Sequence, residues 1–344
     1  MKIVDNRALL LNLRNPGKVT SCIPKSKTLS EHEVIVSWGV DEVQVLRNIG
    51  INAPSPIEGR YEWTGRYDPY DHQKATASFM TLNKKSFCFN EQGTGKTASA
   101  IWAADYLLNQ GKVNRALVIC PLSIMESAWR NDLFSFAMHR KVDVAYGSAK
   151  KRREIIAGDA DFVIINYDGV EIVQDAVEEG GFDLIIVDEA THYKNVQTKR
   201  WKTLAKLVSK DTWLWMMTGT PAAQSPTDAY GIKITNFKWI PKEDATETVH
   251  KALQPAIRFT KDECLDLPPM VYVHREVDMT PQQKKYYKEL KSKMVMQAAG
   301  EQITAANAAV NMNKLLQISS GAVYTDNGDA LEFDITKRYK VLRE

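Results

Sequence analysis

Three short motifs in a fixed order constrain the fold of this chain more than any other feature of its sequence. Residues 90–97 read NEQGTGKT, residues 188–191 read DEAT, and residues 218–221 read TGTP. Apolar residues precede the first two motifs, and a helical pattern follows the first. A glycine-rich turn between a buried strand and a helix directs backbone N–H groups and the helix N-terminus at an anion. The motifs therefore predict an α/β fold that binds phosphate.

The first motif is a predicted phosphate-binding loop. Residues 87–89 suit a buried strand, and a helical pattern runs from Lys96 to Gln110. Glycine lets the backbone curl closely around phosphate oxygens. Lys96 is expected to reach the β- and γ-phosphates, and the Thr97 hydroxyl to bind Mg²⁺. The loop departs from the strict pattern G-x-x-x-x-G-K-[ST], because Asn90 replaces the first glycine.

The second motif supplies an acidic pair. Residues 184–187 form a continuous apolar run, as expected of a strand buried on both faces. Asp188 and Glu189 follow at its C-terminal end, where ligands bind in open α/β sheets. A magnesium ion held by Thr97 needs a carboxylate, and Asp188 fits that role. Glu189 fits the group that orients a water and takes its proton. We therefore predict Lys96, Asp188 and Glu189 as catalytic residues, and Thr97 and Asp188 as the metal site.

The chain resembles Swi/Snf-type ATPases of helicase superfamily two. That family carries D-E-[GA]-H-x-x-K-N, and residues 188–195 read DEATHYKN, so that Thr191 replaces a histidine. In the family, this histidine helps to link the ATP site to the third motif. The third motif, T-G-T-P-x-x-N-S in the family, reads TGTPAAQS here, with Gln224 for asparagine. The resemblance implies a coupling role for Thr218, Gly219 and Thr220.

A further segment resembles the family's adenine-binding element. Residues 69–73 read PYDHQ and are similar to the family's P-Y-Q element, whose glutamine hydrogen-bonds adenine. An amide pairs with both the donor and the acceptor on the adenine edge. Tyr67 or Tyr70 is expected to stack on the ring. With ATP and Mg²⁺ as ligands, the predicted ATP-binding residues are Gln73, Gln92, Gly93, Thr94, Gly95, Lys96 and Thr97.

Two other segments resemble the family's DNA-contacting motifs. Residues 116–123 resemble the motif that leads a strand into a DNA-backbone contact, and residues 162–167 resemble the next strand. The net charge is only +3, so DNA binding must come from local patches. We expect duplex DNA as the partner, held by sequence-independent phosphate contacts. The predicted DNA-binding residues are Pro121, Leu122, Ser123, Asn166 and Tyr167.

Strands and helices alternate over residues 61–255, which predicts a parallel sheet with helices on both faces. This is a RecA-like, ATP-binding helicase lobe of the P-loop NTPase class. Residues 1–60 match none of its motifs and are predicted to form a small accessory α+β unit. Residues 256–270 resemble the family's linker, and residues 271–344 are predicted to begin a second RecA-like lobe. The strands of the first lobe are expected near Phe87, Val118, Val144, Val163, Ile185 and Trp213.

Composition gives expectations about the cellular compartment of the chain. Apolar residues make up 44% and charged residues 25%, as in globular proteins. The four cysteines lack metal-binding spacing, which predicts a reducing compartment without a disulfide framework or zinc. No apolar run approaches the roughly 18 residues of a membrane span, and the start lacks a signal-peptide pattern. We expect a cytoplasmic protein of a bacterial or phage-infected cell, or a nuclear one from a eukaryote.

The sequence leaves several function classes open, and they differ in whether the chain hydrolyses ATP. In the family, arginines of a second-lobe motif, Q-x-x-x-R-x-x-R-x-G-Q, stabilise the γ-phosphate, and no segment of this chain matches it. The chain ends at Glu344 inside a predicted helix, so we expect a fragment of a longer protein or of a split gene. One class is a DNA-dependent ATP hydrolase, a translocase or helicase-like motor whose isolated ATP-binding lobe is weakly active or inactive. The other is a nucleotide-gated DNA-binding module. A P-loop recombinase or small-molecule kinase is a third, which Gln73 and the TGTP motif argue against.

Overall fold

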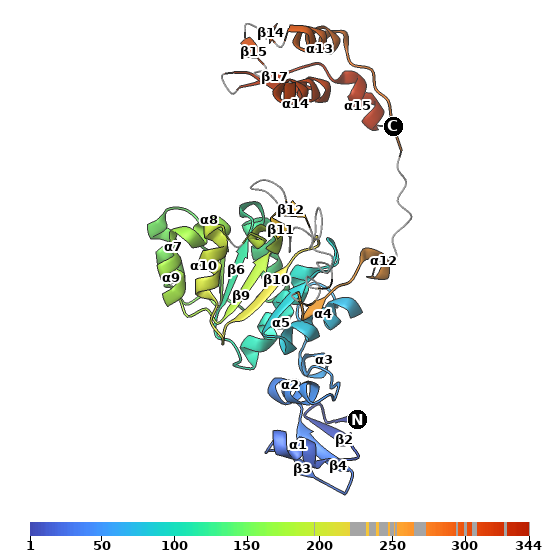
Figure 1. Ribbon diagram of the computed structural model, residues 1–344, viewed down its shortest axis with the longest axis vertical. Coiled ribbons are helices and arrows are strands. Elements are labelled where there is room, and N and C mark those ends of the chain that lie inside the picture. Colours follow the sequence, from blue (N-terminus) through green and yellow to red (C-terminus); the bar gives the residue numbers. More distant parts are fainter. Residues whose placement is uncertain are drawn as a thin grey trace. The chain divides into compact units, whose positions relative to one another are not determined.

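A computed structural model of the chain describes residues 1–195, 197–220, 232–233, 239–240, 247, 251, 253–264, 273–293, 295–298, 301–304, 308–326 and 329–343. The chain divides into two compact units, Met1–Leu267 and Pro268–Glu344 (Figure 1). Two predicted segments lie outside the described residues. They are residues 221–225 of the third motif and residues 265–270 of the linker.

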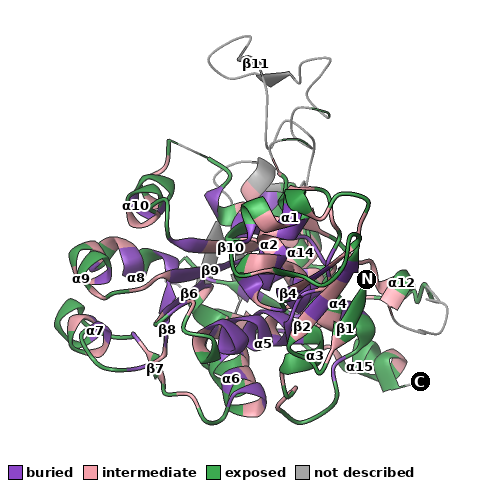
Figure 2. Cartoon of the chain, turned by 90° about the horizontal axis from the view of Figure 1, so that it is seen from below, coloured by how far each residue is buried: buried purple, intermediate pink, exposed green. Residues whose placement is uncertain are grey.

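A seven-stranded sheet forms the middle of the first unit, in the order β13-β5-β10-β9-β6-β8-β7. All of its neighbouring strands pair in parallel. Every residue of β6 (Ala116–Cys120), β8 (Phe162–Asn166) and β9 (Leu184–Asp188) is buried (Figure 2). Continuous apolar runs form such strands because both faces are covered. The sheet confirms the predicted RecA-like fold. The other strands are β5 (Lys85–Cys88), β7 (Val142–Val144), β10 (Trp213–Met217) and β13 (Ala256–Ile257).

Alternate residues of each strand face two different helical layers, because side chains alternate along a strand. Leu117 and Ile185, which pair in register, lie in one core, and Val118 and Ile186 lie in the other. Helices α4 and α5 lie on one side of the sheet, and α7 to α10 lie on the other (Figure 1). The first layer comprises α4 (Asp71–Leu82), α5 (Lys96–Asn109) and α6 (Asn131–Phe136). The second comprises α7 (Ala149–Ile156), α8 (Tyr167–Ile172), α9 (Gln174–Glu179) and α10 (Lys199–Leu207).

The N-terminal residues form a second, antiparallel sheet in the order β1-β2-β4-β3. Its apolar face, with Leu9 and Val36, packs with Leu46 of α2 in the same core that contains Met80 of α4. Because this core is shared, the boundary near residue 60 stays a prediction. The elements are β1 (Lys2–Val4), β2 (Ala8–Asn12), α1 (Gly17–Cys22), β3 (Lys27–Thr28), β4 (Glu33–Ser37), α2 (Val40–Asn48) and α3 (Ile57–Arg60).

The second unit has a small core of its own, formed by Leu290, Ile318, Val323 and Phe333. Thr280 begins its first helix with a reciprocal cap, since its N–H donates to Gln283 Oε1 and its Oγ1 accepts from the Gln283 N–H. Its elements are α13 (Pro281–Lys293), β14 (Val295–Ala298), β15 (Glu301–Thr304), α14 (Ala308–Ser320), β16 (Ala322–Tyr324), β17 (Ala330–Glu332) and α15 (Thr336–Arg343). Its assignment as the beginning of a second lobe stays a prediction.

Short elements complete the first unit, and two observations bear on the environment of the chain. The four cysteines are unpaired. Within the described ranges, no helix has the length and apolar character needed to cross a membrane. The short elements are η1 (Leu122–Ile124), η2 (Met125–Arg130), η3 (Ala190–Tyr193), β11 (Ile232–Lys233), β12 (Trp239–Ile240) and α12 (Lys261–Cys264).

Candidate functional site

The glycine-rich loop connects the C-terminal end of β5 to the N-terminus of α5. Gly93 and Gly95 have φ angles of +88° and +78°, which glycine adopts without steric cost. A Cβ atom at Gly95 would lie 1.9 Å from the Gln73 Nε2 atom. The loop therefore depends on glycine at position 95 for both its conformation and its packing. The positive end of the α5 dipole faces the same loop, which favours an anion there.

The predicted phosphate-binding and acidic residues line one cavity of about 570 Å³ at the C-terminal edge of the sheet. Lys96 Nζ donates to the Glu91 carbonyl at 3.1 Å inside the loop, and its role in binding phosphate stays a prediction. The Thr94 hydroxyl donates to the same carbonyl at 2.7 Å and is buried. The predicted residues that line the cavity are Gln92, Gly93, Gly95, Lys96, Thr97, Pro121, Ser123, Asp188 and Glu189.

Asn90, the residue that replaces the first glycine of the loop, ties the loop to two neighbours. Its side chain is almost fully buried, with the residue 1% exposed. Nδ2 donates to Thr76 Oγ1 at 2.8 Å, and Oδ1 accepts from the Phe259 N–H at 3.0 Å. Asn90 is not among the residues with positive φ, so the backbone does not require glycine there. The departure from the strict pattern thus adds a link from the loop to α4 and to the segment after β13.

Two side chains of helix α4 contact the backbone of the glycine-rich loop. His72 Nε2 donates to the Thr94 carbonyl at 2.8 Å, and Gln73 Nε2 approaches the same carbonyl at 3.4 Å. Gln73 Oε1 accepts from the Tyr70 N–H at 3.0 Å and so caps its own helix. Gln73 is buried and Tyr67 lines the cavity, and the adenine role of Gln73 stays a prediction. Sequence reasoning missed His72, whose only signal was its place beside Gln73.

Asp188 is held by two donors at the end of β9. Its Oδ2 atom accepts from the Trp129 indole N–H at 2.9 Å, and its Oδ1 atom accepts from the Glu189 N–H at 3.0 Å. Burial raises the pKa of the Asp188 carboxyl, and the hydrogen bond from Trp129 offsets part of that rise. Sequence reasoning also missed Trp129, because nothing in the local pattern around it points to a residue so distant in the chain.

The third motif lies between the acidic pair and the loop. Thr218 Oγ1 donates to Glu189 Oε2 at 3.1 Å, and the Thr220 N–H donates to Thr218 Oγ1 at 3.2 Å. A Cβ atom on Gly219 would lie 3.0 Å from the Gln92 nitrogen, so this turn packs directly against the loop. Glu189 has φ +50° and ψ +57°, a conformation that costs a non-glycine residue about 1–3 kcal/mol and is typical of functional sites.

The predicted DNA-binding residues divide into an exposed and a buried group. Leu122, 54% exposed, and Ser123 form an exposed turn at the edge of the cavity, in η1. Asn166 and Tyr167 are buried. Tyr167 begins α8, and its hydroxyl donates to the Asp188 carbonyl at 2.6 Å.

Two further contacts of the buried pair are also made inside the protein. Asn166 Oδ1 accepts from Arg152 Nη1 at 3.0 Å, and the Arg200 guanidinium lies 4.8 Å from the centre of the Tyr167 ring. The structure therefore brings Ser123 to the surface near the cavity but keeps Asn166 and Tyr167 inside.

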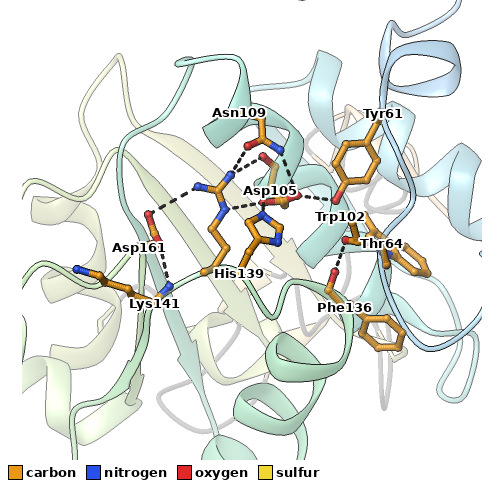
Figure 3. Close-up of polar contacts among 10 residues, drawn as sticks. Tyr61, Thr64, Trp102, Asp105, Asn109, Phe136, His139, Lys141 and Asp161 are labelled. Atoms are coloured by element: carbon orange, nitrogen blue, oxygen red, sulfur yellow. Dashed lines mark hydrogen bonds and ion pairs between the residues drawn. The ribbon is translucent and has the colours of Figure 1, made fainter.

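A buried carboxylate anchors helix α5, whose N-terminus follows the glycine-rich loop. Asp105 is fully buried and accepts from the Tyr61 hydroxyl at 2.7 Å, His139 Nε2 at 2.9 Å and Arg140 Nε at 2.6 Å (Figure 3). A buried charge is tolerated when it is paired and hydrogen-bonded in this way. Burial and the neighbouring Asp105 raise the pKa of Tyr61. Trp102 Nε1 of the same helix donates to the Thr64 carbonyl at 2.7 Å, which adds a second polar contact between α5 and the segment before α4.

The oxygen atoms of Thr97 and Asp188 fit a Mg²⁺ ion whose remaining ligands are waters and substrate phosphates. No group of three or more histidine, cysteine, aspartate or glutamate side chains able to hold a metal occurs among the described residues. Mg²⁺ is commonly bound by one or two protein oxygens, several waters and substrate phosphates. The Thr97 hydroxyl and the Asp188 carboxylate, which line the same cavity as the loop, match that pattern.

Comparisons with known proteins agree with this geometry. Protein p41 of Acyrthosiphon pisum secondary endosymbiont phage 1 is 24% identical over 300 residues, covering 76% of this chain and 65% of p41. The CHD3-type chromatin-remodeling factor PICKLE of Arabidopsis thaliana is 23% identical over 273 residues, covering 66% of this chain and 19% of PICKLE. The chain thus spans only part of the length of these relatives.

A solved structure shares the fold. The Sulfolobus solfataricus SWI2/SNF2 ATPase core in complex with dsDNA aligns with a TM-score of 0.51 and 23% identity, covering 67% of this chain and 53% of that chain. The family of SNF2-related domains matches residues 72–321. This match covers most of the chain and includes all three motifs, and the chain therefore belongs to the SNF2-related domain family.

Proposed function

We propose that this chain is the ATP-binding lobe of a Swi/Snf-type DNA translocase or helicase-like motor, which couples ATP hydrolysis to tracking along duplex DNA. Its membership of the SNF2-related family supports the ATPase class. The observation that carries the proposal is the single cavity lined by Lys96, Thr97, Asp188 and Glu189. A cation, a hydroxyl and two carboxylates around a glycine-rich loop are the parts that phosphoryl transfer from ATP requires.

Each side chain has one task in this proposal. Lys96 leaves the Glu91 carbonyl and binds the β- and γ-phosphates, while the loop N–H groups bind phosphate oxygens. Thr97 and Asp188 hold Mg²⁺, which when bound neutralises charge on the phosphates. Glu189 orients the attacking water and accepts its proton. Thr218, already bonded to Glu189 Oε2, keeps that carboxylate turned toward the cavity.

Duplex DNA is the proposed partner. Leu122 and Ser123 are exposed, and Ser123 lines the nucleotide cavity as well, so DNA and nucleotide meet at one edge of the sheet. A hydroxyl at this position contacts a phosphate and reads no base. The Sulfolobus ATPase core, solved with dsDNA, shares the fold and supports the same partner.

A nucleotide-gated DNA-binding module is the second candidate. No segment of this sequence matches the arginine motif that the family uses at the γ-phosphate. Arginines in related sites contribute roughly 10³–10⁵ in rate, so the chain by itself is expected to turn over ATP slowly or not at all.

Thermal unfolding with ATP and Mg²⁺ tests the nucleotide site. The wild-type chain should melt at a higher temperature when millimolar ATP is added, because a ligand that binds only the folded state stabilises it. Lys96→Ala should remove that rise. Lys210→Ala, which changes an exposed lysine, should keep it. A wild-type chain without any rise would overturn the proposal.

Phosphate release with and without duplex DNA separates the two candidates. Even at the low rate expected of this chain, a motor releases phosphate faster when duplex is added, whereas a gated module binds ATP and DNA and shows no stimulation by duplex. Where turnover is measurable, Glu189→Gln should keep ATP binding and abolish phosphate release. An unchanged rate in Glu189→Gln would show that another group activates the water.

A further inference from the structure

The Trp129 side chain makes a contact that its place in the sequence does not suggest. It is fully buried, yet its indole N–H donates to Asp188 Oδ2 at 2.9 Å across 59 residues of sequence. The other oxygen of this carboxylate accepts from the Glu189 N–H at 3.0 Å. Two donors thus fix the plane of the carboxylate, and an ionised carboxylate with about four acceptor positions keeps about two of them for other ligands.

Trp129 belongs to a short segment whose other end is exposed. The segment begins at Pro121 and includes the exposed Leu122 and Ser123. Local bonds stiffen it: the Ile124 N–H donates to the Pro121 carbonyl, and the Ser127 hydroxyl donates to the Ser123 carbonyl at 2.9 Å. Residues 125–130 form a π-helical turn, a rare conformation that often marks functional sites. The segment therefore connects the surface turn to Asp188 within ten residues.

We propose that Trp129 is a positioning residue that holds Asp188 in the orientation needed for Mg²⁺ and transmits DNA contact at Leu122 and Ser123 to the metal site. This inference rests on the proposed function, since it concerns the same ATP·Mg²⁺ site. An indole nitrogen only donates, so Trp129 supports the carboxylate and binds no metal itself. Phosphate contact at the exposed end shifts the segment, and the indole N–H moves with it relative to Asp188.

The experiment measures how much Mg²⁺ strengthens ATP binding. Isothermal titration calorimetry gives the Kd for ATP in EDTA and in excess Mg²⁺. The Mg²⁺ ratio, the Kd in EDTA divided by the Kd in Mg²⁺, measures how much the metal strengthens ATP binding. Trp129→Phe keeps an aromatic ring but removes the N–H donor. Loss of a group that supports a metal ligand commonly costs about 10–100-fold in metal affinity, so the ratio should fall at least about tenfold while the Kd in EDTA stays unchanged.

Trp215→Phe is the matched control. Trp215 is also fully buried, and its N–H donates to the Asn83 carbonyl at 3.2 Å, near the start of β5 at the opposite edge of the sheet. Its Mg²⁺ ratio should equal that of the wild type. An unchanged ratio in Trp129→Phe, or an equal fall in Trp215→Phe, would overturn the positioning role. If Trp129→Phe does not fold, Trp129→Met takes its place, because methionine adapts to irregular space.

A second arm tests the transmission from DNA. Saturating duplex should raise the Mg²⁺ ratio of the wild-type chain and leave that of Trp129→Phe unchanged. No effect of duplex on the wild type, or an equal effect on both proteins, would overturn the transmission. A wild-type chain that binds no ATP in either buffer would instead overturn the proposed function, so the two failures are distinguishable.

Discussion

Asn90→Ala tests whether the departure from the glycine pattern stabilises the loop. The substitution removes the donor to Thr76 Oγ1 and the acceptor of the Phe259 N–H. Thr76 keeps its own donated bond to the His72 carbonyl at 2.7 Å, so it loses only an accepted bond. The Phe259 N–H loses its partner, which is the more costly change.

The two losses set the expected magnitude. An ordinary hydrogen bond contributes about 0.5–1.5 kcal/mol net, and a buried polar group left without a partner costs about 1–3 kcal/mol. Asn90→Ala should therefore lower the free energy of unfolding by about 2–4 kcal/mol. At about 2–4 °C per kcal/mol for a unit of this size, the melting temperature should fall by roughly 5–15 °C. Asn90→Gly should lower the melting temperature at least as far, because glycine adds backbone entropy to the unfolded chain.

Urea unfolding followed by circular dichroism measures this change, and a double-mutant cycle assigns it. Thr76→Val removes the hydroxyl from the other side of the Asn90 bond. If the bond itself is stabilising, Asn90→Ala and Thr76→Val together should cost about 0.5–1.5 kcal/mol less than the sum of the single changes. Asn48→Ala, at an exposed position of α2, is the control and should change stability by at most about 0.5 kcal/mol.

Two outcomes would refute this reasoning. The first is equal stability of Asn90→Ala and the Asn48→Ala control, which would show that the buried amide contributes nothing. The second is a stability of Asn90→Gly above that of the wild type, which would show that the loop does require glycine at this position.

Three further predictions concern charge. Asp105→Asn should lower the free energy of unfolding by about 1–3 kcal/mol, because Tyr61, His139 and Arg140 lose the buried carboxylate to which they donate, although Arg140 keeps its ion pair with Asp161. A change below about 1 kcal/mol in urea unfolding would contradict this prediction. Burial raises the pKa of Asp132 above its ordinary 3.8, so the folded state prefers the protonated form and this carboxyl destabilises it as pH rises through the folded pKa. Asp132→Asn should therefore raise the melting temperature at pH 7 and have no effect near pH 3, and an equal rise at both would exclude titration as the cause. Fluorescence anisotropy with a labelled random-sequence duplex should give weak binding. The slope of log binding constant against log salt concentration should be about −2 to −4, whereas tight binding to one sequence would contradict binding through phosphate contacts.

The central sheet could be predicted from the sequence because its strands are strongly patterned. Continuous apolar runs predicted strands near Val118, Val163 and Ile185, and these are β6, β8 and β9. The three other expected strands are β5, β7 and β10. Burial on both faces selects such runs, so the local sequence carries the information.

The edge strand β13 could not be predicted in the same way. Ala256–Ile257 fell at the beginning of the expected linker, yet this segment pairs with β5 and continues the sheet. The Phe89 N–H donates to the Ile257 carbonyl at 2.8 Å. Two residues are too few to show a period of two, and a parallel pairing over such a sequence distance leaves no local signal.

The site shows the same division between local and long-range information. The loop glycines and the acidic pair follow their strands directly, so sequence order alone predicted that they lie at one edge. Trp129 and His72 act through contacts to residues far along the chain, which no window of sequence contains. The DNA role of Tyr167 stays a prediction, and no signal in the sequence pointed to the bond from its hydroxyl to the Asp188 carbonyl.

The acidic pair and the third motif are joined in this chain without the histidine that the family uses. Thr191 stands at that position, while Thr218 Oγ1 donates directly to Glu189 Oε2 at 3.1 Å. Sheet register places these residues together, since Met217 of β10 pairs with Asp188 of β9 and each strand is followed by one of the bonded residues. The backbone of Glu189 is strained, and its N–H bond to Asp188 and its side-chain bond from Thr218 hold it in place. Because this bond depends on neighbouring parallel strands, the change at position 191 leaves the contact between the third motif and the acidic pair in place.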